Sequence, residues 1–234
     1  ESPYSKDILI TDRVYEVINN IALEEGYFSI QDTSSALVVR LLDPNPEESI
    51  LDLFAGPGGK ATYIAEIMHN TGEIIAVDKF PEKIKKIKKA MEILQIKNIK
   101  TVVKDALQYG PIAPAFDKVL LDVPCSGWGV FQKKAELRWQ KNQNMNELLK
   151  LQENALKYSS SFVKSGGFLI YSTCTLNHRE NEEQVMNFLK RNQEFTLVPP
   201  DNTQKNFITE GGFLKTIPFK HNMDGAFAAK MQKS

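Results

Sequence analysis

From Ser49 onward, short apolar runs rich in β-branched residues alternate with longer segments whose apolar residues recur at helical spacing. Runs of this kind are typical of buried parallel strands when helices separate them. We expect strands at 49–54, 73–78, 99–104, 117–122 and 167–172, helices at 60–69, 81–95, 143–163 and 180–192, and strand-like segments at 194–198, 212–217 and 225–232. The alternation predicts an α/β fold: a Rossmann-like, doubly wound, mostly parallel sheet with an antiparallel strand near its C-terminal end.

The N-terminal part of the chain has a different pattern. Residues 11–25 carry apolar positions at helical spacing, and 34–42 indicate a second helix after the capping residues Asp32 and Thr33. The sequence D-P-N-P at 43–46 breaks regular structure. This pattern predicts a small helical extension packed on a larger α/β domain. The predicted units are the N-terminal extension at 1–46 and the main domain at 47–234.

Composition excludes some classes of protein. Lysine and arginine together number 29, as do aspartate and glutamate, so the formal net charge is zero. A zero net charge argues against a generally basic nucleic-acid coat but is compatible with a local basic patch. No apolar run approaches the roughly 20 residues that a membrane helix needs, and two cysteines do not make a disulfide framework. We expect a cytoplasmic protein without membrane contact, and a monomer.

A glycine-rich turn, A-G-P-G-G-K at 55–60, follows the first expected strand. Glycines let the backbone approach a ligand closely, and the N-terminus of the next helix offers unpaired N–H groups. Carboxylates end the next two strands, with Asp78 placed to bind ribose hydroxyls and Asp105 to bind an adenine edge. A single aspartate in such a place is more often a strand end or a helix cap. Three such strand ends in order favour a bound nucleoside.

The only two cysteines follow apolar runs, Cys125 in L-L-D-V-P-C-S-G and Cys174 in Y-S-T-C-T. Ligands of open α/β sheets bind beyond the carboxyl ends of the strands, so we expect both thiols to face one ligand. A buried structural role is the usual one for cysteine, but polar turn-forming loops argue against it here. Three histidines without ligand spacing disfavour zinc, and we predict no metal. A nucleophilic thiol is favoured, with Lys60 as a source of the positive charge that stabilises a thiolate.

Together these motifs resemble the Sun/Nop family of S-adenosylmethionine-dependent RNA cytosine-C5 methyltransferases, in particular the bacterial Fmu/RsmB group that modifies small-subunit ribosomal RNA. The resemblance covers almost the whole chain. It is carried by G-Y-F-S-I-Q-D-T-S-S at 26–35, D-L-F-A-G-P-G-G-K at 52–60, D-V-P-C-S-G-W-G-V at 122–130, S-T-C-T-L-N-H-R-E-N-E-E at 172–183 and H-N-M-D-G-A-F-A-A at 221–229. It implies a class I methyltransferase domain, S-adenosylmethionine as cofactor, and RNA, in this group ribosomal RNA, as substrate.

The resemblance also implies roles for single residues. Cys174 would attack C6 of cytosine, and Cys125 would assist release of the product by helping to remove the C5 proton. Addition at C6 is needed because C5 is a poor nucleophile until an enamine-like adduct forms. Asp122 and Lys60 would lie at the edge of the base. The residues implied to hold the cofactor are Phe54, Ala55, Gly56, Pro57, Gly58, Gly59, Lys60, Asp78, Asp105 and Asp122.

Contacts to RNA are expected just after the first cysteine loop, where basic and aromatic residues occur together. Basic side chains bind phosphates, and aromatic rings stack on a base that has left its helix. The lysines of the 81–95 helix are spread around it, which favours a solvated face. The predicted RNA contacts are Lys133, Lys134 and Arg138, with Trp128 and Trp139 for stacking.

Two alternatives remain open. DNA cytosine-C5 methyltransferases use the cysteine of the Pro-Cys loop as nucleophile, which would make Cys125 the attacking residue. The T-C-T motif followed by E-N-E argues against that class. A non-catalytic RNA-binding relative would be expected to lose a thiol or the glycine turn, and the chain has both.

Overall fold

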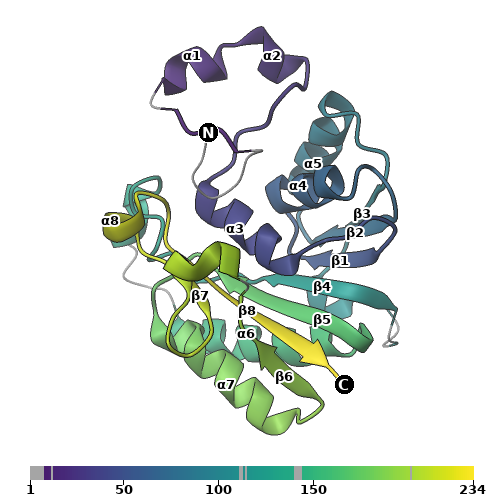
Figure 1. Cartoon of the computed structure of the whole chain (residues 1–234), viewed down its shortest axis with the longest axis vertical. Helices are drawn as coiled ribbons and strands as arrows, with labels where there is room; N and C mark the ends of the chain where they lie inside the picture. Colours follow the sequence, from purple (N-terminus) through teal and green to yellow (C-terminus); the bar gives the residue numbers. More distant parts are fainter. Residues whose placement is uncertain (1–7, 12, 111–112, 114, 140–143, 201) are drawn as a thin grey trace.

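A computed structural model describes residues 8–11, 13–110, 113, 115–139, 144–200 and 202–234 (Figure 1). The strands are β1 (Ser49–Leu53), β2 (Glu73–Asp78), β3 (Ile99–Val103), β4 (Phe116–Asp122), β5 (Val163–Thr173), β6 (Phe195–Val198), β7 (Leu214–Thr216) and β8 (Ala226–Lys233). The α-helices are α1 (Val14–Ile18), α2 (Ile21–Glu24), α3 (Thr33–Leu42), α4 (Gly59–Ile67), α5 (Pro81–Ile93), α6 (Met145–Ser160), α7 (Glu182–Arg191) and α8 (Pro218–His221).

All described strands belong to one sheet with the order β3-β2-β1-β4-β5-β8-β6, in which β7 pairs with the first residues of β8. Strands β1 to β5 pair with one another in parallel. Strand β8 runs antiparallel to both β5 and β6. The predicted doubly wound, mostly parallel α/β fold with an antiparallel C-terminal strand is confirmed.

Helices cover both faces of the sheet, with α3, α4 and α5 on one side and α6 and α7 on the other (Figure 1). Successive side chains of a strand point to opposite faces, so each central strand contributes to two cores. Ile50 and Leu120 pack under α3 and α4, whereas Leu51 and Leu121 pack with α6 and α7. Burial on both faces explains why these strands are continuous apolar runs rather than alternating patterns.

The single helix expected over 11–25 is wrong, and residue 12 lies outside the described residues. The chain forms two short helices, α1 and α2, separated by Asn19 and Asn20. The side chain of Asn20 accepts a hydrogen bond from the backbone N–H of Ala22, so Asn20 caps the start of a new helix. The apolar spacing alone did not reveal this interruption.

Helix α3 begins as expected behind Asp32, whose carboxylate accepts a hydrogen bond from the N–H of Ser34 at 2.9 Å. It ends before Asp43, which takes a left-handed conformation with φ of 55°. Leu37 and Leu42 of α3 are buried in the same core as β1 and β4. The extension thus contributes α3 to the main core, and the division after residue 46 stays a prediction.

Three later elements have boundaries that differ from expectation. The helix predicted over 143–163 is α6, which ends at Ser160, and residue 143 lies outside the described part. Strand β5 begins at Val163, four residues before the predicted start. The helix predicted over 180–192 is α7, which begins at Glu182 and follows a 3₁₀ turn at His178–Glu180. This turn lies close to the second cysteine loop.

Candidate active site

A cavity of about 390 Å³ lies at the carboxyl ends of β1, β4 and β5. Its wall includes the glycine turn, the Asp122 end of β4 and the Cys174 loop after β5. The segments that surround it are far apart in sequence and include the start of α3 and the residues just before β8. The lining residues are Ile30, Gln31, Asp32, Ser34, Ser35, Val38, Asp52, Phe54–Lys60, Asp122, Val130, Lys133, Lys134, Thr173, Cys174, Asp224 and Ala226.

The two thiols meet at this edge of the sheet. The Sγ atoms of Cys125 and Cys174 lie 3.2 Å apart, and the backbone N–H of Cys174 donates to Sγ of Cys125 at 3.3 Å. Both cysteines are free and partly buried. The sequence prediction that two separate loops bring both thiols to one place agrees with this geometry.

The two thiols have opposite acidities. The hydrogen bond from Cys125 lowers the pKa of Cys174, and the positive charges of Lys60 and Lys134 act in the same direction against burial and Asp122. The same hydrogen bond, followed by burial and the negative charge of Cys174, raises the pKa of Cys125 well above its usual value. Cys174 is therefore the better thiolate, and Cys125 is the proton donor of the pair.

An ion pair crosses the cavity beside the thiols. The Nζ atom of Lys60 lies 2.6 Å from Oδ2 of Asp122, and Ser172 donates its hydroxyl to the other carboxylate oxygen at 2.7 Å. Burial opposes the charge of Lys60, but the carboxylate of Asp122 raises the pKa of the lysine above its usual value. Lys60, the last residue of the glycine turn, therefore keeps its positive charge, and this charge acts on Cys174.

Asp52 is a site residue that the sequence analysis missed. It lies in β1, is 1 % exposed and lines the cavity. Neither of its carboxylate oxygens has a hydrogen-bond partner in the described part of the chain. Burial, together with the charges of Asp122 and Asp78, raises its pKa to about 8, although Lys60 opposes the shift. The available signal was a carboxylate inside the apolar run L-D-L-F just before the glycine turn.

The glycine turn packs too tightly for side chains at two positions. Gly58 caps α4 with φ of 110°, a conformation that favours glycine, and a Cβ there would meet Ile87 at 2.8 Å. A Cβ at Gly56 would lie 2.7 Å from a carboxylate oxygen of Asp78. The turn thus holds its backbone at the cavity wall, next to the end of β2.

Neither of the two acids predicted to bind a nucleoside belongs to the lining of the cavity. Asp78 is buried at the end of β2, where it accepts hydrogen bonds from the N–H groups of Gly56 and Phe80 and pairs with Lys83 at 3.3 Å. Asp105 caps a short 3₁₀ turn. Each therefore has a structural role of the kind that competes with the ligand-binding interpretation.

The predicted RNA-binding residues are divided by the structure. Lys133 lies at the cavity, but it forms ion pairs with Asp32 at 2.5 Å and Asp224 at 2.8 Å. The two carboxylates offset its positive charge. Lys134 also lines the cavity. Arg138 is exposed outside that lining, with its guanidinium 5.7 Å from the ring centre of Phe131.

The aromatic candidates are accessible. Trp128 is 46 % exposed and Trp139 is 79 % exposed, so neither belongs to the core. On α5, by contrast, Ile84 and Ile87 are buried while the neighbouring lysines face solvent, in agreement with the predicted solvated face.

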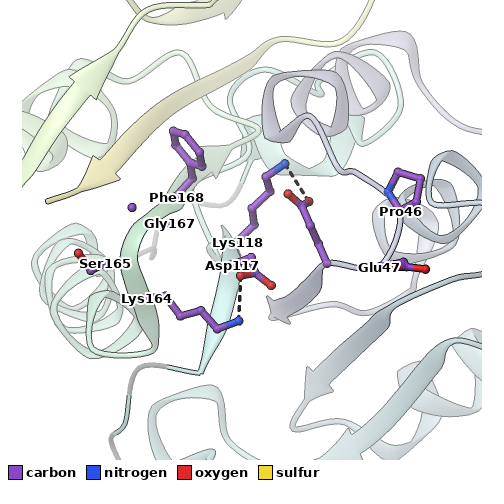
Figure 2. Close-up of a pocket in the computed structure, with 10 residues that line it drawn as sticks. Pro46, Glu47, Asp117, Lys118, Lys164, Ser165, Gly167 and Phe168 are labelled. Atoms are coloured by element: carbon purple, nitrogen blue, oxygen red, sulfur yellow. Dashed lines mark hydrogen bonds and ion pairs between the residues drawn. The ribbon is translucent and has the colours of Figure 1, made fainter.

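A second hollow, of about 450 Å³, lies at the opposite edge of the sheet, where β1, β4 and β5 begin. Figure 2 shows its two ion pairs, Lys118 with Glu48 at 2.9 Å and Lys164 with Asp117 at 2.8 Å. Because these charges are already paired and the cysteines lie at the other edge, we assign no ligand to this hollow.

Within the described residues, no group of three or more His, Cys, Asp and Glu side chains is arranged to hold a metal ion. Among the same residues, no helix has the length and apolar character needed to span a membrane.

A protein-family model described as 16S rRNA methyltransferase RsmB/F matches residues 39–232, which is most of the chain. The chain belongs to this family. The match includes the glycine turn, both cysteine loops and most of the residues around the cavity. The resemblance expected from the motifs is confirmed.

Relatives of this RsmB/F-family chain are named as methyltransferases of ribosomal or transfer RNA. A probable ribosomal RNA small subunit methyltransferase B from Synechocystis is 40 % identical over 217 residues, covering 90 % of the chain and 48 % of the relative. A tRNA (cytosine(72)-C(5))-methyltransferase from Pyrococcus horikoshii is 35 % identical, covering 91 % and 54 %. The crystal structure of NSun6 from Pyrococcus horikoshii with SFG superposes with a TM-score of 0.81 at 32 % identity, covering 92 % and 55 %. The chain spans about half the length of the curated relatives it matches.

Proposed function

We propose that this chain is the catalytic part of an RNA cytosine-C5 methyltransferase that uses S-adenosylmethionine. The observation that carries the proposal is the thiol pair, with sulfur atoms 3.2 Å apart beside a cavity that contains the Lys60–Asp122 ion pair. A thiol of lowered pKa next to one of raised pKa suits a reaction that needs a nucleophile first and a proton acceptor later. The names of the relatives, which are rRNA and tRNA methyltransferases, support it.

The residues around the cavity fit the proposed cofactor. When bound, S-adenosylmethionine supplies an electrophilic methyl group on a positively charged sulfur. The unpartnered carboxyl of Asp52 is suited to a cationic ligand, and the backbone of Gly56–Gly58 lies close enough for a ligand to contact it. SFG, bound in the Pyrococcus relative, is an analogue of S-adenosylmethionine, which supports this choice.

The chain's own residues then attack the base, orient it and release the product. The thiolate of Cys174 forms a bond to C6 of cytosine, and the electron pair of the C5–C6 double bond becomes available at C5 for the methyl group. The Lys60–Asp122 pair, at the end of β4, orients the polar edge of the base. Removal of the C5 proton then lets the C5–C6 double bond re-form as the bond from C6 to sulfur breaks, which regenerates the thiolate.

Cys125 becomes a base only after Cys174 has reacted. In the free protein its pKa is raised first by the hydrogen bond it donates to Cys174, then by burial and by the charge of Cys174. Once Cys174 is bonded to carbon, its sulfur carries no charge, so two of these three causes weaken. Cys125 can then lose its proton to solvent and accept the C5 proton. The acidity order favours this assignment over the DNA-type alternative, in which Cys125 attacks.

The substrate class and setting are part of the proposal. We assign ribosomal RNA as substrate because the matching family model is described as 16S rRNA methyltransferase RsmB/F and the Synechocystis relative also has a ribosomal RNA methyltransferase name. Two free thiols work in a reducing compartment, which supports a cytoplasmic location. We also propose a monomer as the catalytic unit, because the thiol pair and the Lys60–Asp122 ion pair that carry the proposed chemistry both lie within one chain.

Methyl transfer can be measured with radiolabelled S-adenosylmethionine and RNA isolated from cells that lack the gene. We expect label in small-subunit ribosomal RNA, and bisulfite sequencing then locates the modified cytosine. Methylation of transfer RNA alone would show that transfer RNA, and not ribosomal RNA, is the substrate. No transfer to either RNA by the full-length protein would contradict the proposed activity.

Replacement of Asp78 tests the cofactor prediction. We propose that its carboxylate, now bonded to Gly56 and Phe80, also accepts hydrogen bonds from the ribose. Asp78→Ala should weaken S-adenosylmethionine binding by about 1–3 kcal/mol, or roughly 5- to 150-fold, measured by calorimetry. The exposed neighbour Glu82 provides the control Glu82→Ala. Equal affinity of Asp78→Ala and the wild type would remove Asp78 from the site.

Charge removal near the cavity tests the RNA surface. Lys133 is already paired with two carboxylates, so the double variant Lys134→Ala/Arg138→Ala is the cleaner probe of phosphate contacts. If both residues contact phosphates, RNA binding weakens and the slope of log K against log salt falls by roughly 1.4 to 1.8. S-adenosylmethionine affinity should stay unchanged.

The matched control lies on α5, where Lys85→Ala/Lys86→Ala removes the same number of positive charges from an exposed surface. We expect little change in the salt slope. A larger effect from the α5 variant would place the RNA on that helix instead.

A further inference from the structure

We propose that the adjacent residues Glu180 and Asn181 are positioning residues, each holding one of the two cysteine loops. Glu180 holds the Cys125 loop and Asn181 holds the Cys174 loop. The inference rests on the proposed function, because it assigns product release to the residue that Glu180 holds. Both residues are fully buried, at 0 % exposure, between β5 and α7.

The carboxylate of Glu180 binds the residue that follows Cys125. One of its oxygens accepts the hydroxyl of Ser126 at 2.5 Å, and the other accepts the backbone N–H of Ser126 at 2.8 Å. Gln152 of α6 and Asn177 donate to the same carboxylate, each at 3.0 Å. Four donors on one buried carboxylate fix the backbone next to the Cys125 thiol.

Asn181 binds both neighbours of Cys174. Its side-chain oxygen accepts the hydroxyl of Thr173 at 2.6 Å, and its amide nitrogen donates to the backbone carbonyl of Thr175 at 2.9 Å. These contacts flank the nucleophile on its two sides. They use one donor and one acceptor, which is what an amide offers and a carboxylate does not.

The two loops are joined directly as well. The hydroxyls of Ser126 and Thr175 lie 2.7 Å apart, and the N–H of Gly129 donates to the carbonyl of Cys174 at 3.0 Å. A Cβ at Gly129 would lie 2.8 Å from that carbonyl oxygen, so the close approach depends on glycine. The spacing of the thiols therefore depends on the contacts of Glu180 and Asn181 together with these bridges.

The division of contacts predicts different defects for two isosteric substitutions. In Glu180→Gln, an amide NH₂ replaces one acceptor oxygen and faces a donor, so the Cys125 loop is disturbed while the contacts of Asn181 remain. In Asn181→Asp, a carboxylate oxygen faces the carbonyl of Thr175, so the Cys174 loop is disturbed. Loss of Cys125 geometry should slow release of the methylated base, whereas loss of Cys174 geometry should slow attack.

The test measures the denaturant-resistant protein–RNA adduct during turnover, with Glu183→Gln, an exposed position of α7, as matched control. We expect Glu180→Gln to accumulate at least tenfold more adduct than Glu183→Gln, with lower kcat and unchanged S-adenosylmethionine affinity. Asn181→Asp should form less adduct than the control. Equal adduct levels in Glu180→Gln and Glu183→Gln would overturn the inference, as would loss of adduct in both Glu180→Gln and Asn181→Asp.

A second readout does not depend on the reaction. The rate of thiol alkylation against pH, followed for each cysteine by peptide mass spectrometry, should change for Cys125 in Glu180→Gln and for Cys174 in Asn181→Asp. If Glu180→Gln fails to fold, Gln152→Leu removes one donor to the same carboxylate without touching the Cys174 loop and should give the same adduct and alkylation changes. If the wild type transfers no methyl group and Cys125→Ala forms no adduct, the proposed function fails. The alkylation profiles alone then decide whether these residues position the thiols, and unchanged profiles overturn it.

Discussion

Cys125→Ala is expected to accumulate a covalent protein–RNA adduct that survives denaturation, whereas Cys174→Ala should form none and transfer no methyl group. Cys174 has the lowered pKa, so its removal takes away the proposed nucleophile. Activity should fall below detection, because a reaction that proceeds through a covalent bond keeps no route around its nucleophile. The measurement is gel electrophoresis of labelled RNA after incubation with S-adenosylmethionine, beside an assay of methyl transfer.

The effect of Cys125→Ala follows from the order of the steps. The variant keeps the Cys174 nucleophile and the Lys60–Asp122 ion pair, so addition and methylation proceed. The C5 proton then has no acceptor beside it, and elimination stalls. Loss of the hydrogen bond from Cys125 also raises the pKa of Cys174, so adduct formation should be faster at pH 8.5 than at pH 7.

The double variant Cys125→Ala/Cys174→Ala is the control and should give no adduct. Serine at position 125 keeps the size of the side chain and should also trap the adduct, which separates chemistry from packing. An adduct in Cys174→Ala but not in Cys125→Ala would reverse the assignment and favour the DNA-type mechanism.

The sequence predicted the frame of the sheet because its strands are buried on both faces. Leu51 and Ile50 point to opposite cores, so β1 is apolar on both faces except at Asp52 and is recognised without knowing its neighbours. The two cysteine loops were predicted to meet for a related reason, since parallel strands end at the same edge. In contrast, the break between α1 and α2 depends on the conformation of Asn20, which apolar spacing does not encode.

Pairing between distant residues was not predictable in the same way. Lys133 seemed free to bind phosphate, but α3 and the residues before β8 bring Asp32 and Asp224 to it, from 101 and 91 positions away in the sequence. Asp52 was hidden for the opposite reason, because burial inside a strand made it part of an apolar run. Charges in a folded site depend on partners that only the tertiary structure supplies.

Replacement of Asp52 should change both stability and cofactor binding. Its pKa is raised from 3.8 to about 8 in the folded protein, so between these values the folded state binds more protons than the unfolded state. The contribution of Asp52 to the free energy of unfolding is therefore fully present below pH 4 and is lost as pH rises toward 8. Asp52→Asn removes the titration, so the stability of the variant should fall less steeply with pH.

The size of this effect follows from linkage. One group bound in the folded state and released on unfolding changes the unfolding free energy by ~1.4 kcal/mol per pH unit, or on the order of 2–3 kcal/mol between pH 5 and pH 7. Denaturant unfolding of both proteins at the two pH values measures the difference. The charges that face Asp52, namely Asp122, Asp78 and Lys60, are the same in both proteins and serve as a common background. Parallel pH profiles would show that Asp52 is ionised in the folded protein at pH 5 as well.

Cofactor binding gives the second half of the test. A cationic ligand beside Asp52 favours its ionised form, so S-adenosylmethionine should release a proton from the wild-type protein near pH 7. Calorimetry in two buffers of different ionisation enthalpy detects that proton as a difference in the observed heat. Asp52→Asn should bind more weakly and show no such difference. If the variant keeps both wild-type affinity and proton release, the proton comes from another group, and Asp52 has no part in holding the sulfonium.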